Sequence, residues 1–189
     1  MIGDGTWRGG ATLYPASRFI ASAAGPVRAF PRASPKIAVQ AARMRWHIFA
    51  IGKPKLGFAR EGLEEYAKRV KPFVPVEVHY VKASAQTGES GALLERSKGM
   101  FRIVLDERGD HVTSRALARK VSDWEMQGPR DFALLVGGAD GHTEELRQAA
   151  GWSWSLSKLT LQHELALVVA LEQLYRAYTI KAGLPYHRD

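Results

Sequence analysis

The sequence predicts an α/β fold built on a mostly parallel β-sheet. Short apolar runs with strand character alternate along the chain with longer stretches whose apolar residues recur at helical spacing. Pro and Gly residues separate these stretches at regular intervals from Met44 onward. One run, Phe132 to Val136 (FALLV), is apolar at every position, as in a strand that is covered on both faces. This alternation is typical of a sheet with helices packed against both of its faces.

Local patterns define each predicted element. The first strand ends at Gly52 and Pro54, and the helix after it ends at Pro72, because proline cannot continue a helix. Thr113 or Ser114 can cap the helix that starts there. In chain order we predict a strand at 45–51, a helix at 58–71, a strand at 74–81, a loop at 86–88, a short helix at 89–98, a strand at 102–105, a helix at 113–127, a strand at 132–136, a helix at 143–150, a short strand at 158–161 and a helix at 163–182.

Residues 1–43 differ in character from the rest of the chain. They are rich in Ala, Gly, Pro, Ser and Arg, and they carry six basic residues against one acidic residue. Without a sustained apolar period, such a segment cannot bury enough surface to offset the entropy of ordering it. It can be a disordered basic tail, an organellar transit peptide, or sequence upstream of a true start at Met44. We favour the third interpretation, because a regular single domain, residues 44–189, begins there.

Composition excludes several classes of protein. The chain has 189 residues and no cysteine, so it has no disulfide framework and no thiolate metal site. This composition suits a reducing cytoplasm, where we expect the protein to act. The longest apolar run, Leu165 to Leu171, is too short for a membrane span, which takes about 20 residues, so we expect no membrane association. The formal charge of +8 fits a polyanionic partner without requiring one.

A glycine-rich loop, residues 137–141 (GGADG), directly follows the FALLV strand and precedes a helix. In open α/β sheets ligands bind at the carboxyl ends of strands, where glycine lets the backbone approach and a helix N-terminus offers free N–H groups. The loop matches neither the GxGxxG dinucleotide fingerprint nor the phosphate-binding P-loop. A ligand-binding loop and a plain tight turn are therefore equally open.

Other polar residues give weaker signals. Asp106 and Glu107 follow another strand, but neighbouring residues on an extended chain point to opposite sides, so joint acid–base work is not expected. His163 precedes the last helix and His187 lies in the tail, each without a partner in the sequence. The remaining histidines show no metal-ligand spacing, and we expect no metal; they are His47, His79, His111 and His142.

The last predicted helix is apolar nearly all round. Its many Leu and Val residues cannot all face one core, so we expect the helix to be buried on two sides. In a chain of this size the second side would meet a partner subunit, most simply a two-fold copy. The alternative is a central helix within one chain.

The order and the sequences of these stretches resemble one family. GGADG is followed by SWSLSKLTL (153–161), HELALVVALEQLYRA (163–177) and PYHR (185–188), and it is preceded by IFAIGKPK, EEYAKRV and LDERG. Together they resemble the RlmH family of bacterial ribosomal RNA methyltransferases, in the SPOUT superfamily, over essentially residues 44–189. Residues 1–43 lie outside the family pattern. Gln162 stands where the family commonly has Pro, and Leu167 stands where it commonly has Arg.

The resemblance implies a C-terminal trefoil knot, S-adenosyl-L-methionine as cofactor, and a homodimer that is joined largely through the last helix. The implied substrate is a pseudouridine in an exposed loop of 23S rRNA within the assembled ribosome, methylated at base N3. The family's cofactor-binding positions correspond to Leu105, Gly137, Leu156, Ser157, Lys158, Leu159, Thr160 and Leu161.

Methyl transfer to N3 requires a base held outside its stack, loss of the N3 proton, and alignment with the methyl group. We hypothesise that Tyr186, His187 and Arg188 shape this pocket, with His187 as proton acceptor or relay and Arg188 holding phosphate or an imide oxygen. Two other interpretations stay open: a non-catalytic ribosome-binding protein, and a nucleotide-dependent oxidoreductase or phosphotransferase. Candidate phosphate contacts are Arg176, Lys53 and Lys55.

Overall fold

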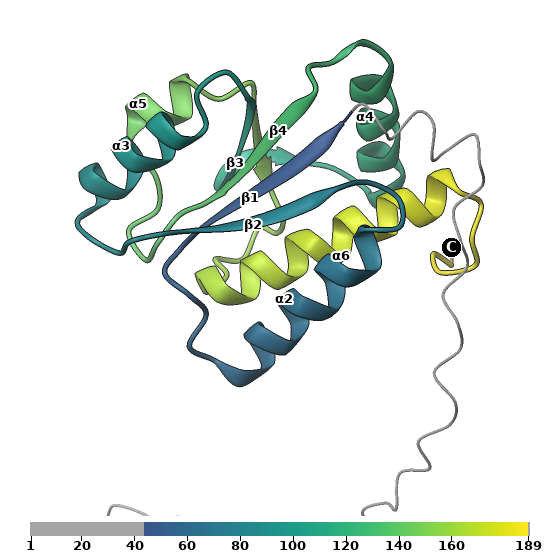
Figure 1. Cartoon of the computed structure of the whole chain (residues 1–189), viewed down its shortest axis with the longest axis horizontal. Coiled ribbons are helices and arrows are strands. Elements are labelled where there is room, and N and C mark those ends of the chain that lie inside the picture. The colour runs from purple at the N-terminus through teal and green to yellow at the C-terminus, as the bar shows by residue number, and fades with distance from the viewer. Residues whose placement is uncertain (1–43, 189) are drawn as a thin grey trace, which may run out of the picture.

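The computed structural model describes residues 44–188, in which strands and helices alternate (Figure 1). The expectation of a non-native extension at residues 1–43 falls outside the described residues. In chain order the elements are β1 (Arg45–Ile51), α2 (Gly57–Val70), β2 (Val76–Val81), α3 (Gln86–Arg96), β3 (Phe101–His111), α4 (Ser114–Gln127), β4 (Asp131–Val136), α5 (Glu144–Gln148), β5 (Trp152–Ser155) and α6 (His163–Lys181).

The five strands form one sheet in the order β2-β1-β4-β3-β5, and every strand pairing is parallel. The α/β fold with a parallel sheet, predicted from the alternation of patterns, is therefore confirmed. The fully apolar strand β4 lies between β1 and β3, where both of its faces are covered. Strand β4 ends at Val136, and β3 leaves its pairing with β4 after Val104, so the two strands separate at the same edge of the sheet.

Helices cover both faces of the sheet (Figure 1). Helices α2, α4 and α6 lie on one face, and α3 and α5 lie on the other. The alternation of side chains along each strand supplies both cores. In β1, Trp46 and Ile48 join the core under α2, α4 and α6, whereas Phe49 and Ile51 join the core under α3 and α5.

Helix α6 is flanked by α2 and α4 and packs most of its apolar surface inside this one chain. Leu171, Leu174 and Tyr178 are fully buried, and the Tyr178 hydroxyl accepts a hydrogen bond from Trp46 Nε1 at 3.0 Å. A narrower apolar strip that includes Leu165, 36% exposed, stays at the surface. Most of the helix is thus the central helix of one chain, and its composition alone does not require a partner. None of the helices in residues 44–188 is long and apolar enough to cross a membrane.

Three predicted elements differ from the structure. The short strand predicted at 158–161 is wrong: β5 is Trp152–Ser155, and residues 156–162 form a loop. The tryptophans of β5, Trp152 and Trp154, face the core, whereas Leu159, in the similar alternation of residues 158–161, is 75% exposed. The loop predicted at 86–88 is the first turn of α3. Strand β3 continues past Leu105 to His111 through an irregularity in its pairing with β5.

Candidate functional site

A cavity of about 460 Å³ opens at the carboxyl end of β4, beside the part of β3 that follows its pairing with β4. Three segments form most of its wall: residues 105–108 of β3, the glycine-rich loop with His142, and the chain that leads from β5 toward α6. Gln86 of α3 and Arg147 of α5 close one side, and His163 and Ala166 at the start of α6 close another. The cavity therefore lies where ligands bind in open parallel sheets.

The glycine-rich loop is both a tight turn and a wall of this cavity. Gly141 has a φ of 67°, which favours glycine, and it forms an isolated bridge with Gly138. A Cβ on Gly137 would lie 3.1 Å from the Gly141 backbone. A Cβ on Gly138 would lie 2.6 Å from Glu89 Oε2. Without side chains at these two positions, the backbone itself faces the cavity.

The loop after β5 supplies the opposite wall. Its turn is fixed locally, because the Leu159 N–H donates to Ser157 Oγ at 3.0 Å. The Thr160 hydroxyl donates to Glu107 Oε2 at 2.7 Å, which ties the loop to β3. The resemblance gave eight residues a cofactor role, and all of them except Lys158 line the cavity. The seven that do are Leu105, Gly137, Leu156, Ser157, Leu159, Thr160 and Leu161.

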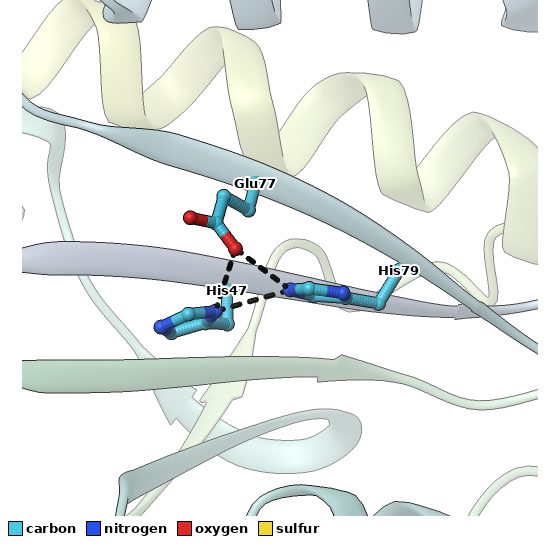
Figure 2. A group of neighbouring side chains, drawn as sticks. All are labelled: His47, Glu77 and His79. Atoms are coloured by element: carbon cyan, nitrogen blue, oxygen red, sulfur yellow. Dashed lines mark hydrogen bonds and ion pairs between the residues drawn. The ribbon is translucent and has the colours of Figure 1, made fainter.

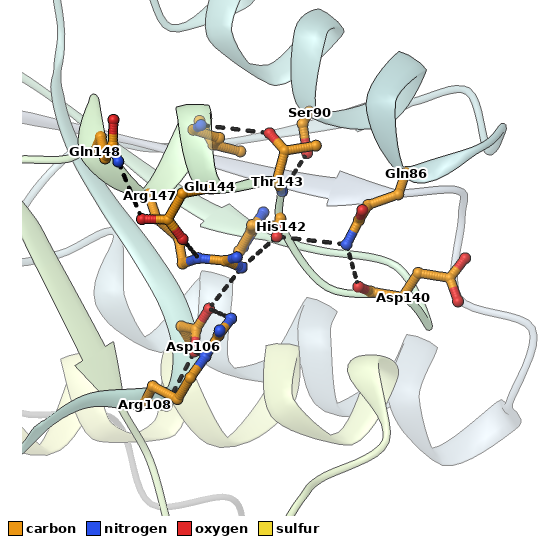
Figure 3. A network of polar contacts seen from close by, with 11 residues as sticks. Gln86, Ser90, Asp106, Arg108, Asp140, His142, Thr143, Glu144, Arg147 and Gln148 are labelled. Atoms are coloured by element: carbon orange, nitrogen blue, oxygen red, sulfur yellow. Dashed lines mark hydrogen bonds and ion pairs between the residues drawn. The ribbon is translucent and has the colours of Figure 1, made fainter.

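Asp106 anchors a polar network (Figure 3), whose members Asp106, Arg108 and Arg147 line the cavity. Its carboxylate accepts two hydrogen bonds from the Arg108 side chain, at 3.0 and 3.1 Å, and one from Arg147 at 3.4 Å. Burial alone would raise the pKa of Asp106, but these bonds and the two positive charges hold that pKa below its usual value. Glu107 binds Thr160 instead, so the two neighbouring carboxylates point to different partners, and a joint acid–base role has no support.

Helix α3 and the Arg147 side chain hold the glycine-rich loop in place (Figure 3). Gln86 Nε2 donates to the Asp140 carbonyl at 2.6 Å, and the Thr143 N–H donates to Ser90 Oγ at 3.0 Å. The Arg147 guanidinium donates to the His142 carbonyl. The glycine-rich loop is therefore held in place by residues whose roles the sequence patterns did not indicate.

His142 is a cavity-lining residue that sequence reasoning missed. It is 1% exposed, and burial holds the pKa of its imidazole below the usual value, so the ring is neutral at neutral pH. The one available signal was its position, directly after Gly141 and before the Thr143 N-cap of α5. His163, singled out as a lone histidine, also lines the cavity.

A family model described as "Predicted SPOUT methyltransferase" matches residues 44–187. The chain belongs to the SPOUT methyltransferase family. Ribosomal RNA large subunit methyltransferase H of Thermus thermophilus is 47% identical over 145 residues, which cover 77% of this chain and 99% of that protein. The protein of the same name from Deinococcus radiodurans is 43% identical over 145 residues, with the same coverage. The protein of that name from Desulfotalea psychrophila is 38% identical over 156 residues, which cover 77% of this chain and 100% of that protein.

A solved structure described as a probable methyltransferase from Bordetella pertussis aligns with a TM-score of 0.49 and 13% identity. The alignment covers 77% of this chain and 99% of that one.

In this SPOUT methyltransferase, the proposed catalytic tail lies outside its own chain's cavity. The Tyr186 hydroxyl donates to Glu172 Oε1 at 2.9 Å, and the Arg176 guanidinium lies 4.7 Å from the centre of the Tyr186 ring. Arg176 Nη1 is 3.5 Å from His187 Nδ1. Glu172 is six residues past Ala166, which lines the cavity, and thus about 9 Å further along α6. The roles given to Tyr186, His187 and the exposed Arg188 stay predictions.

Gln162 and Leu167, the two residues at which the sequence departs from the pattern it resembles, each have a visible structural role. Gln162 is the N-cap of α6, where its side-chain oxygen accepts a hydrogen bond from the Leu165 N–H at 3.0 Å. It thereby satisfies one of the free donors at the start of the helix. Leu167 is 1% exposed and belongs to the core under α6.

The three basic residues considered as phosphate contacts are differently placed. Arg176 is bonded to Glu172 at 2.5 Å, and Lys53 Nζ lies 5.9 Å from the centre of the Tyr80 ring. The Lys55 N–H donates to both oxygens of Glu164 at 3.0 Å. None of these three basic residues lines the cavity.

Proposed function

We propose that the chain transfers a methyl group from S-adenosyl-L-methionine to N3 of a pseudouridine in 23S rRNA of the assembled ribosome. The observation that carries the proposal is the cavity whose walls are the glycine-rich loop and the loop after β5, in a chain of the SPOUT methyltransferase family. Relatives named as large subunit ribosomal RNA methyltransferases match over nearly their whole length at 43–47% identity. Action on ribosomes in the cytoplasm is part of the same proposal.

The cavity fits S-adenosyl-L-methionine in size and chemistry. Its volume is within the range of about 300–1,000 Å³ that holds small cofactors. Leu105, Trp154 and Leu156 give apolar wall for an adenine ring. Gly137 and Gly138 line the cavity with backbone alone, so a base or a carboxylate can approach the chain closely there. When bound, the cofactor supplies a methyl group on a positively charged sulfur.

The proposal includes a two-fold dimer whose sites combine both chains. Tyr186, His187 and Arg188 do not line their own cavity, so a second copy must bring its tail there if the tail acts in catalysis. Exposed apolar side chains suit such a contact: Leu159, which lines the cavity, is 75% exposed, and Leu56 and Phe58 at the start of α2 are 42% and 54% exposed. We further propose that residues 156–161 and α6 complete the trefoil knot implied by the family.

In the proposed reaction the N3 proton leaves the pseudouridine, the N3 lone pair forms the new N–C bond, and the bond between sulfur and the methyl carbon breaks. His187 would accept the proton, and Arg188 would hold a phosphate or an imide oxygen. Tyr186 does not act as a base, because burial first, and hydrogen bonds with Tyr66 and Glu172 next, raise the pKa of its hydroxyl far above the usual value. Tyr186 instead orients the tail through Glu172.

Calorimetric titration tests the cofactor assignment. We expect one S-adenosyl-L-methionine per chain and no measurable binding of NAD or ATP. Binding of NAD or ATP without S-adenosyl-L-methionine would instead support the nucleotide-dependent enzyme. Cofactor binding without transfer to unmodified ribosomes would favour the non-catalytic ribosome-binding protein.

Subunit mixing tests the shared site. A Gly137→Ala chain carries a damaged cavity, and a His187→Ala chain carries a damaged tail. If each site combines one cavity with the partner's tail, mixed dimers hold one site with neither change, and methyl transfer recovers in part. No recovery from dimers shown to have exchanged subunits would contradict the shared site.

A further inference from the structure

The geometry points to a binding site for a divalent transition metal, best suited to Zn²⁺, formed by His47, Glu77 and His79 on β1 and β2 (Figure 2). This site is separate from the cavity and does not depend on the proposed methyl transfer. It goes against the expectation of no metal, which was based on the scattered positions of the histidines in the sequence.

The three potential ligand atoms converge on one point (Figure 2). His47 Nδ1 and His79 Nε2 are 3.0 Å apart, and each lies 3.6 Å from Glu77 Oε2. Tetrahedral Zn²⁺, with bonds of about 2.0–2.1 Å, places neighbouring donor atoms about 3.3 Å apart. One hydrogen bond at 3.0 Å can join the two rings without an ion. The Glu77 carboxylate, at 3.6 Å, is too far from either ring for a good hydrogen bond, and its position matches that of a third metal ligand.

The parallel pairing of β1 with β2 creates this arrangement. His47 pairs with Glu77, and Phe49 pairs with His79, so all three ligands project from the same face of the two strands. The His79 ring also stacks on Phe49, with ring centres 4.8 Å apart. These contacts hold the second histidine in position before any ion binds.

A carboxylate behind the first histidine completes a pattern common at metal sites. His47 Nε2 lies 3.3 Å from Asp131 Oδ1, on the neighbouring strand β4. If His47 donates its Nε2 proton to Asp131, its Nδ1 lone pair is free for a metal, and the ring orientation is fixed. Arg45 also binds Asp131 Oδ1, at 3.0 Å, and keeps that carboxylate in place.

Charge and exposure at this site suit a cation. Glu77 supplies the one negative charge among the three ligands. The side chain of His79 is 34% exposed, which leaves a path for an ion and a position for a water ligand.

The site lies away from the methyl-transfer cavity. None of its three ligands lines that cavity, and His47 is three residues before Ala50, which pairs with the last residue of β4. This separation is about 10 Å along the sheet. A bound ion would therefore join the edge strand β2 to β1 and, through Asp131, to β4, which is a structural role.

Zinc titration of the full-length, tag-free chain, after removal of metals with EDTA, tests the site. We expect one Zn²⁺ per chain, and with Co²⁺ the visible absorption of a tetrahedral site. His79→Ala and Glu77→Gln, which change partly or fully exposed side chains, should each weaken Zn²⁺ binding at least tenfold. Asp131→Asn should weaken it about 10–100-fold, as loss of a carboxylate behind a ligand does. His111→Ala, at an exposed histidine in β3, is the matched control and should bind as the unchanged chain does.

Thermal unfolding gives a second measure. Zn²⁺ should raise the unfolding midpoint of the unchanged chain and of His111→Ala, because it binds only the folded state, and it should not raise that of His79→Ala. The proposal is overturned if the unchanged chain binds no Zn²⁺, or if His79→Ala and Glu77→Gln bind it as tightly as the unchanged chain.

Discussion

Replacing Glu164 tests how the start of α6 holds the start of α2. Glu164 is the second residue of α6, and it is 7% exposed. Its carboxylate accepts hydrogen bonds from the backbone N–H groups of Lys55, at 3.0 Å, and Leu56, at 2.9 Å. Leu56 is the N-cap of α2 and has no side-chain cap of its own. A side chain from a helix 108 residues further along the chain therefore anchors this turn.

The expected loss on Glu164→Ala follows from these bonds. Hydrogen bonds to a charged group contribute about 1.5–3 kcal/mol each, but Lys55 and Leu56 are exposed, and water can partly replace the carboxylate. We therefore expect the free energy of unfolding to fall by about 2 kcal/mol in total. For a domain of this size, the midpoint of thermal unfolding should fall by about 4–8 °C.

The pH dependence gives a second signature. The backbone hydrogen bonds from Lys55 and Leu56 hold the pKa of Glu164 below its usual value. In the unfolded chain the carboxyl group titrates near its usual value, about 4.3. The stabilisation is therefore fully present above that value, and it is lost as the pH falls through the lower pKa of the folded state. Glu164→Gln should be less stable than the unchanged chain at pH 7, and the gap should narrow in acid.

Urea unfolding at pH 7, and at steps down to about pH 3.5, measures both effects. Glu61→Ala, at an exposed glutamate on α2, is the control and should change stability by less than about 0.5 kcal/mol. If Glu164→Ala is as stable as Glu61→Ala at pH 7, or if its deficit is the same at every pH, the carboxylate does not anchor this turn.

Three further substitutions test the core and the cavity. Tyr178→Phe leaves the buried Trp46 N–H without its acceptor and should lower the free energy of unfolding by about 1–3 kcal/mol in urea; an unchanged value would show that the bond contributes nothing. Thr160→Val removes the bond to Glu107 at the surface and should weaken S-adenosyl-L-methionine binding by about fivefold with unchanged thermal stability. Equal affinity would mean that this tie does not shape the cavity. Gly137→Ala places a Cβ 3.1 Å from backbone, a crowding of about 1–3 kcal/mol, and calorimetry should detect weaker cofactor binding; full affinity would place the cofactor elsewhere.

Much of the fold could be predicted because its signals are local. The FALLV run, the breaks at Gly and Pro, and the Thr113 cap each depend on a few adjacent residues, and β4 and α4 lie where these patterns put them. The strand predicted at 158–161 was wrong because a loop that lines a cavity can alternate apolar and polar residues as a strand does. Only the pairing of β5 with β3 distinguishes the two, and that pairing involves residues about 50 positions apart in the sequence.

The site was only partly predictable, for the same reason. Glycines after a buried strand indicated one wall of the cavity, to which the adjoining His142 belongs, but Gln86 and Arg147 reach the cavity from helices whose sequences contain no motif. The cluster of His47, Glu77 and His79 depends on strand register, which places residues 30–32 positions apart next to each other. Sequence spacing cannot show such a contact.

The most direct test of the proposed function uses labelled S-adenosyl-L-methionine and ribosomes that lack the modification. After incubation with the full-length chain, the 23S rRNA is digested to nucleosides and analysed by mass spectrometry. We predict that the label appears in about one N3-methylpseudouridine per 23S rRNA, and that His187→Ala, with unchanged cofactor binding, strongly reduces it. No label in the rRNA, or label on a different nucleoside, would contradict the account.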